Sequence, residues 1–161
     1  MISIHVQSNP YLGLEISNDL KWSLHINNVT KKANATLGFL RRNLRNVPEN
    51  CRKTAYIVLV TVRSIMEYGA TIWNPYIKGD IDKLKKIQKR AIRFIKKDYK
   101  TRTPGSITKM RKELELDTLE ERRTSLRLIL MYKVVEGLVP ALPSTSFVKN
   151  AKPKRQIKAK I

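Results

Sequence analysis

Cysteine is almost absent from this chain, because Cys51 is the single cysteine among 161 residues. One cysteine excludes an intramolecular disulfide, and a chain without a CxxC pair or a histidine-rich cluster lacks the usual ligands of a zinc site. The cysteine usage therefore predicts a reducing, intracellular compartment.

Long hydrophobic runs are also missing. The longest apolar stretch covers residues 55–62 and is followed by the charge of Arg63. A membrane-spanning helix needs about 20 apolar residues, so no integral membrane segment is expected. The first residues show no basic segment followed by an apolar core, and no secretory signal is expected either.

Catalytic motifs are not recognisable. The sequence has no G-x-S-x-G, Walker loop, HExxH or Tyr-x-Asp-Asp pattern, and His5 and His25 are isolated. The grouped acids, Asp80 with Asp82 and Asp117 with Glu120 and Glu121, fall at expected helix starts, where capping explains them. No catalytic residue, metal site or small-molecule substrate is therefore predicted.

Aromatic residues make up only 7% of the chain, which leaves little for a surface that stacks on bases. The larger rings occupy positions typical of a packed core. We expect four of them in the core rather than against bases: Tyr11, Trp22, Trp73 and Phe94.

Acidic residues are few as well: 13 Asp and Glu face 33 Lys and Arg, for a formal charge of +20. Self-repulsion of this size disfavours a compact state unless counterions or a ligand neutralise it. The imbalance indicates a polyanionic partner, and the 42% of hydrophobic residues are enough for a folded core.

The patterning predicts a mainly α fold of about five helices after a short N-terminal β-hairpin. Ile2, Ile4 and Val6 alternate before a turn expected at residues 8–10, and a second strand is expected over 11–16. From about Ser23 the period becomes helical, with a stripe at Ile26, Val29, Ala33, Leu37, Leu40 and Leu44.

A second helix is expected over 48–68. A third is expected from Ile81 to about Lys97, with Gly79-Asp80 as its N-terminal cap, and a short fourth helix is expected after Ser106, which caps it. Three aromatic residues are expected to anchor the connection after the helix over 48–68: Tyr68, Trp73 and Tyr76. The last helix starts with a capping box from Thr118 to Glu121, and its apolar part over 126–138 is expected to be buried. The predicted divisions are 1–17, 18–78, 79–140 and a basic, disordered tail over 141–161.

The helix expected from Ile81 carries the most informative charge pattern. Its apolar residues share one face, and no acid interrupts the opposite face between Asp82 and Asp98. That face contains Lys83, Lys85, Lys86, Lys89, Arg90, Arg93, Lys96 and Lys97. Because so many cations repel one another within a Debye length, the pattern favours contact with nucleic acid. A solvated face and a membrane-surface helix remain as alternatives.

Further cations extend this basic surface. Arg42 and Arg45, with Arg41 beside them, lie outside the apolar stripe of their helix. The cations at 122, 123 and 127 either join the surface or pair with Glu120 and Glu121. Phosphate contacts of this kind position a ligand without reading its base sequence.

An ordered series of short motifs resembles the region after the catalytic core of LINE-type, non-LTR retrotransposon reverse transcriptases. It covers about residues 10 to 139 and includes Tyr11-Leu-Gly-Leu14, Leu20-Lys-Trp-Ser-Leu-His-Ile26, Leu37-Gly-Phe-Leu-Arg-Arg42, Ala55-Tyr56, Val62-Arg63-Ser-Ile-Met-Glu-Tyr68, Trp73-Asn-Pro75, Ile87-Gln-Lys-Arg-Ala91, Leu119-Glu-Glu-Arg-Arg123 and Tyr132-Lys133.

The resemblance implies that Tyr11, Leu12 and Gly13 match the turn of a primer-grip hairpin, and that the following helices match the thumb and adjoining C-terminal region. It implies binding of an RNA/DNA template-primer duplex, with the upstream polymerase core as a second partner and a nuclear location. The family's catalytic aspartates, and the Mg²⁺ they hold, lie upstream of these motifs. We therefore expect a non-catalytic gripping fragment without a cofactor of its own; the alternative is a structural scaffold that needs the polymerase core.

Overall fold

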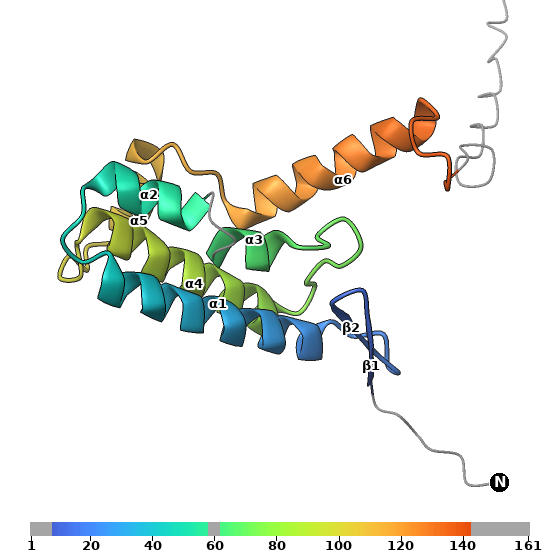
Figure 1. Ribbon diagram of the computed structural model, residues 1–161, viewed down its shortest axis with the longest axis horizontal. Helices are drawn as coiled ribbons and strands as arrows, with labels where there is room; N and C mark the ends of the chain where they lie inside the picture. Colours follow the sequence, from blue (N-terminus) through green and yellow to red (C-terminus); the bar gives the residue numbers. More distant parts are fainter. Residues whose placement is uncertain (1–7, 58–61, 143–161) are drawn as a thin grey trace, which may run out of the picture. The chain divides into compact units, whose positions relative to one another are not determined.

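The protein is mainly helical, with a two-stranded antiparallel hairpin before the helices, as the sequence predicts. The structure, a computed structural model, describes residues 8–57 and 62–142 (Figure 1). By their contacts the residues divide into two units, Met1–Leu126 and Arg127–Ile161, each of which is described by itself. The predicted strand residues Ile2, Ile4 and Val6 and most of the predicted basic tail lie outside the described residues.

The hairpin joins β1 (Ser8–Tyr11) to β2 (Leu14–Ser17) through the two-residue loop Leu12-Gly13. Both loop residues have positive φ, 47° and 79°, as a type I′ turn requires. The predicted turn at residues 8–10 is therefore wrong: these residues lie in β1, because the loop conformation suits Gly13 and a two-stranded hairpin tolerates Pro10 at its edge.

Helices α1 (Ser23–Asn43) and α4 (Lys78–Lys96) lie side by side and run in the same direction (Figure 1). Polar contacts between them keep one register: Ser23 meets Asp80, Asn27 meets Lys83, and Asn34 meets Arg90. The predicted α1 stripe is confirmed, since Ile26, Val29, Ala33, Leu37 and Leu40 are buried and Leu44 is partly buried against the core.

The N-terminus of α4 differs from the prediction. The helix begins at Lys78, so Gly79 and Asp80 lie inside its first turn instead of capping it. The Asp80 carboxylate is buried and accepts hydrogen bonds from Ser23 Oγ (2.5 Å) and Lys83 Nζ (2.7 Å). The side chain that the local pattern assigned to capping is therefore bound instead by Ser23 of α1 and by Lys83, one turn further along α4.

The segment between α1 and α4 contains α2 (Glu49–Ile57) and α3 (Val62–Glu67), which flank the four residues that are not described. Of the aromatic anchors predicted after α3, only Trp73 is fully buried; Tyr68 and Tyr76 are exposed. Gly69 has a φ of +65°, and a Cβ there would lie 2.8 Å from Leu14 Cδ2, so glycine lets the connection approach the hairpin.

Helix α5 (Ser106–Glu113) starts after Gly105, and Ser106 is its first residue with no capping side-chain bond, unlike the prediction. Met110 of this helix and Leu114 after it belong to the hydrophobic core. Helix α6 (Leu119–Val135) opens with the predicted capping box: Glu121 N–H donates to Thr118 Oγ1 (3.1 Å), and Thr118 N–H donates to Glu121 Oε2 (2.7 Å).

Most of the apolar second half of α6 is exposed, contrary to the prediction, although Val134 is buried. Six large side chains are 48–65% exposed: Leu128, Ile129, Met131, Tyr132, Val135 and Leu138. Within the unit that begins at Arg127, few described residues follow the helix, and a sequence of apolar residues produces burial only where another element covers them.

Candidate nucleic-acid interface

The two faces predicted for α4 are confirmed. Its buried residues are Asp80, Leu84, Ile87, Gln88, Ala91, Ile92, Phe94 and Ile95, and they pack on α1, α2 and α5. The remaining arc carries the cations. Burial of the apolar stripe therefore fixes the orientation of the helix and holds the basic arc outward.

The cations at the edge beside α1 are held by polar neighbours. Lys83 Nζ lies 2.7 Å from both Asp80 Oδ1 and Asn27 Oδ1. Arg90 Nη1 donates to Asn34 Oδ1 at 2.9 Å, a neutral acceptor that orients the guanidinium and leaves its charge uncompensated. Lys83 is therefore neutralised and Arg90 is not.

Acids from other elements lie at the opposite edge. Lys96 Nζ lies 3.1 Å from Glu113 of α5 and 3.2 Å from Glu49 of α2, and Lys85 Nζ lies 3.7 Å from Glu120 of α6. The hydrogen bond with Glu113, and then that with Glu49, raises the pKa of the Lys96 ammonium. No acid interrupts the basic face along the sequence, but tertiary contacts bring acids to its edge.

The centre of the basic face keeps its charge. Lys86 and Lys89 are exposed, and within the described residues neither has an ion pair or hydrogen bond. Arg93 donates from Nη1 and Nη2 to the carbonyls of Asp98 (3.2 Å) and Thr101 (2.8 Å), which fix its position, and its charge interacts with the Asp98 carboxylate. Of the predicted site residues on α4, Lys86, Lys89 and Arg90 thus form a central group without a carboxylate partner among the described residues.

A pocket of about 840 Å³ lies where α1 and α4 both end. We call it the arginine pocket, after the cations that line it with Tyr99: Arg41, Arg42, Arg45, Arg52 and Lys97. No Asp or Glu is found among its described lining residues. Three predicted site residues, Arg42, Arg45 and Lys97, are brought together here although 52 positions separate Arg45 from Lys97 in the sequence.

Arg52 forms part of the pocket wall from α2. It is buried, and its guanidinium donates from Nε and Nη2 to the carbonyl of Ile95 and from Nη1 to that of Val47. The described residues place no carboxylate within ion-pair distance of it. Arg41 lies over the ring of Tyr99, with its Cζ 4.9 Å from the ring centroid.

The primer-grip-like residues Tyr11, Leu12 and Gly13 lie at the other end of α1, about 30 Å from the arginine pocket by the length of a 21-residue helix. The hydroxyl of Tyr68 donates to the carbonyl of Leu12 (2.8 Å) and holds the turn. Tyr11 is 64% exposed, so its predicted place in the core is wrong, whereas Trp73 and Phe94 are buried and Trp22 packs partly against the core.

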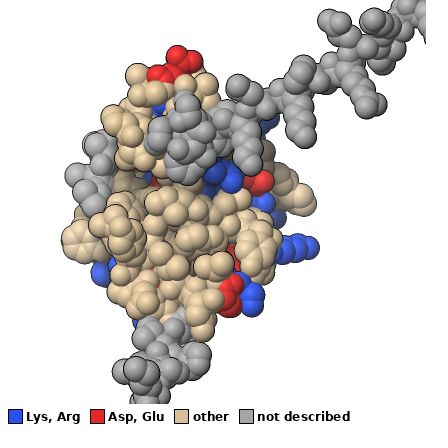
Figure 2. All heavy atoms as spheres, turned by 90° about the vertical axis from the view of Figure 1, so that its right-hand side faces the viewer, with Lys and Arg blue, Asp and Glu red and all other residues tan. Residues whose placement is uncertain are grey.

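Figure 2 views the molecule from the right-hand side of Figure 1, where the hairpin lies, and charged residues are sparse among the described residues in this view. Most of the described surface in this view comes from residues other than Lys, Arg, Asp and Glu.

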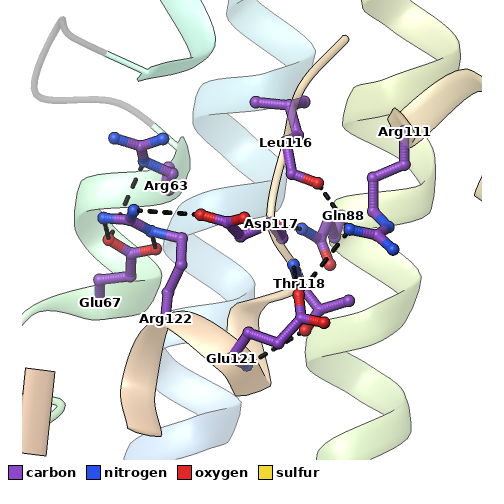
Figure 3. Close-up of polar contacts among 9 residues, drawn as sticks. All are labelled: Arg63, Glu67, Gln88, Arg111, Leu116, Asp117, Thr118, Glu121 and Arg122. Atoms are coloured by element: carbon purple, nitrogen blue, oxygen red, sulfur yellow. Dashed lines mark hydrogen bonds and ion pairs between the residues drawn. The ribbon is translucent and has the colours of Figure 1, made fainter. Parts of the chain in front are cut away.

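At the start of α6, Arg122 has carboxylate partners on α3 and in the chain before α6 (Figure 3). Arg122 binds Glu67 of α3 through two nitrogen–oxygen contacts of 2.5 and 3.0 Å, and Asp117 at 3.9 Å. Arg123 is buried over the ring of Trp73. Structural pairing, one of the two alternatives for this group, therefore holds for Arg122, with acids other than the expected Glu120 and Glu121.

Two residues that line the pocket, Arg52 and Tyr99, were not predicted from the sequence as site residues. For Arg52 a signal existed, because it shares a helical face with Ala55 and Tyr56, and a cation on an apolar face is held for a structural or binding reason. Tyr99 follows the end of α4 and offered no comparable signal.

Groups of three or more His, Cys, Asp or Glu that could hold a metal ion are not found in the described part of the chain. None of the described helices is long and apolar enough to cross a bilayer. Comparisons with protein-family models, with curated proteins and with solved structures find no match for this chain.

Proposed function

We propose that this chain is a non-catalytic nucleic-acid-binding domain that grips the phosphate backbone of a template-primer duplex within a LINE-type RNA-directed DNA polymerase. One observation carries the binding role: among the described residues, Lys86, Lys89 and Arg90 at the centre of the α4 face have no carboxylate partner, although acids lie at both of its edges. The polymerase context depends on the resemblance of residues 10 to 139.

The dimensions of the face suit a phosphate backbone. A 19-residue helix such as α4 is about 28 Å long, and one nucleic-acid strand has a phosphate about every 3.4 Å. Because the strand winds around the duplex axis over this length, only some of these phosphates face the helix at once. The central cations of α4 follow one another at one-turn intervals. Contacts of this kind bind without base specificity.

Whether a cation already has a carboxylate partner decides how much it contributes to the affinity for nucleic acid. An unpaired cation releases counterions from the nucleic acid when it binds, whereas one already held by carboxylates must first give up those partners. Lys89 and Lys96 provide a matched comparison, because they lie two turns apart on the same side of α4 and differ in their carboxylate partners.

The test is binding of a fluorescent RNA·DNA duplex over a range of salt concentrations. Lys89→Gln should reduce the slope of log K against log salt by about one, and the double change Lys86→Gln with Lys89→Gln by about two. Lys96→Gln, the matched control, should reduce it by less than half as much. Equal effects of Lys89→Gln and Lys96→Gln would mean that only net charge matters and that α4 offers no defined surface.

A second candidate function is supported by the exposed apolar side chains of α6. Leu128, Met131 and Tyr132 are each more than 50% exposed, as expected of a scaffold that needs another domain to cover it. Dye binding to exposed apolar surface, with weak duplex affinity in a folded sample, would favour this scaffold role. Addition of the polymerase core should then abolish the dye signal.

A further inference from the structure

We propose that the arginine pocket is a discrete binding site for a phosphate group, separate from the diffuse charge of the α4 face. The inference depends on the proposed function for the source of the phosphate, a nucleic-acid chain, but not for the phosphate chemistry itself. The pocket volume of about 840 Å³ lies within the range of small-ligand sites.

The negative C-terminal ends of α1 and α4 do not neutralise the positive charge of the pocket. The C-terminal end of a helix carries roughly half a negative charge, so the ends of α1 and α4 together supply about one. Five cations line the pocket and no acid is found among its described lining residues. About four positive charges therefore remain for an anion to neutralise.

The composition of the pocket favours binding of one phosphate group over nonspecific attraction of counterions. Four of its five cations are arginines, whereas six of the eight predicted cations of α4 are lysines. A guanidinium has a fixed fork of donors that matches two oxygens of a phosphate, whereas a lysine acts as a point charge. The arginine-rich end is therefore suited to recognise one group at one position.

Two of the arginines are held in place before any ligand binds. The carbonyls of Ile95 and Val47 accept hydrogen bonds from Arg52, which uses three of its five N–H donors and leaves two. The guanidinium of Arg41 packs on the ring of Tyr99. Groups fixed in this way lose less conformational entropy when an anion binds.

Gly38 offers a test that leaves every charge in place. It lines the pocket from α1, and a Cβ there would meet only Arg42 Nη1, at 3.6 Å, which is ordinary contact. A Cβ therefore fits at this position, and we expect the remaining atoms of Gly38→Leu to extend into the pocket. The variant should unfold at the same or a higher temperature, because glycine is a poor helix residue. Ala35→Leu is the matched control, an exposed position on the same helix that does not line the pocket.

The experiment is calorimetric titration of the whole chain with pyrophosphate, and with a short duplex bearing either a terminal phosphate or a terminal hydroxyl. Gly38→Leu, and the double change Arg42→Gln with Arg45→Gln, should each weaken pyrophosphate binding about tenfold or more, as expected when charge-assisted hydrogen bonds are lost. Ala35→Leu, and Lys86→Gln with Lys89→Gln, should change it less than threefold. A stronger effect on the phosphate-ended duplex assigns the site to a terminal phosphate, and equal effects assign it to an internal phosphodiester.

Several results would overturn the site. They are no pyrophosphate binding by the unaltered chain, unchanged binding by Gly38→Leu, or tighter binding of an oligoglutamate than of either phosphate ligand. Duplex binding that depends on Lys86 and Lys89 but not on Gly38 refutes the pocket and retains the proposed function. Pyrophosphate binding that depends on Gly38, without any duplex binding, refutes the proposed function and retains the pocket.

Discussion

The pairing of Glu67 with Arg122 should stabilise the contact between α3 and the start of α6 by a measurable amount. The pair is bidentate, and the side chains are only 12% and 29% exposed. Removing one partner of a fully buried pair costs about 3–5 kcal/mol. Here each partner keeps a weaker contact when the other is removed: Glu67 with Arg63, and Arg122 with Asp117, both at 3.9 Å.

We therefore expect Glu67→Gln and Arg122→Met each to lower the free energy of unfolding by about 1.5–3 kcal/mol, with a coupling energy of about 1–2 kcal/mol between them. The assay is urea denaturation of the two single variants, the double variant and the unaltered chain. Glu120→Gln, which changes an exposed acid on the same helix, is the control and should stay within about 0.5 kcal/mol. A coupling energy below about 0.5 kcal/mol would refute the reasoning, because Arg122 would then be free to join the basic surface.

Two further predictions concern the first turns of α4 and α6. Burial raises the pKa of Asp80, but hydrogen bonds from Lys83 and Ser23 outweigh it and hold the pKa below its ordinary 3.8. Asp80 therefore stabilises the fold above pH 3.8, and this stabilisation is lost as the pH falls through the lowered pKa. In Asp80→Asn the stability should no longer show this loss at low pH, which thermal unfolding from pH 7 to pH 2 would measure. Thr118→Ala removes the Oγ1 acceptor of the capping box but keeps the backbone N–H that donates to Glu121, and it should lower the free energy of unfolding by about 1 kcal/mol in urea; no change would refute the cap.

Periodicity predicted the parts of the fold that local chemistry determines. The stripe from Ile26 to Leu40 and the buried face of α4 follow from helical spacing alone, and the capping box at Thr118 follows from its residue types. The turn at Leu12-Gly13 was misplaced because Ser8-Asn9-Pro10 gives an equally strong local turn signal, and only strand pairing decides between them.

Tertiary contacts decided the rest of the candidate site. The sequence grouped eight cations on one helical face, but not the carboxylates of Glu49 and Glu113 that approach Lys96 from two other helices. The same holds for the arginine pocket, because its residues come from α1, from α2 and from the chain after α4. Helical spacing describes one element at a time, so it cannot show which cations are neutralised.

The salt dependence of duplex binding by the unaltered chain tests the central claim most directly. The α4 centre supplies three cations without carboxylate partners among the described residues, and the arginine pocket three further predicted site residues, so up to six phosphates can be contacted. We predict that log K falls with log salt at a slope of about −4 to −6, independent of base sequence. A slope shallower than about −2, or an affinity that depends on base sequence, would contradict it.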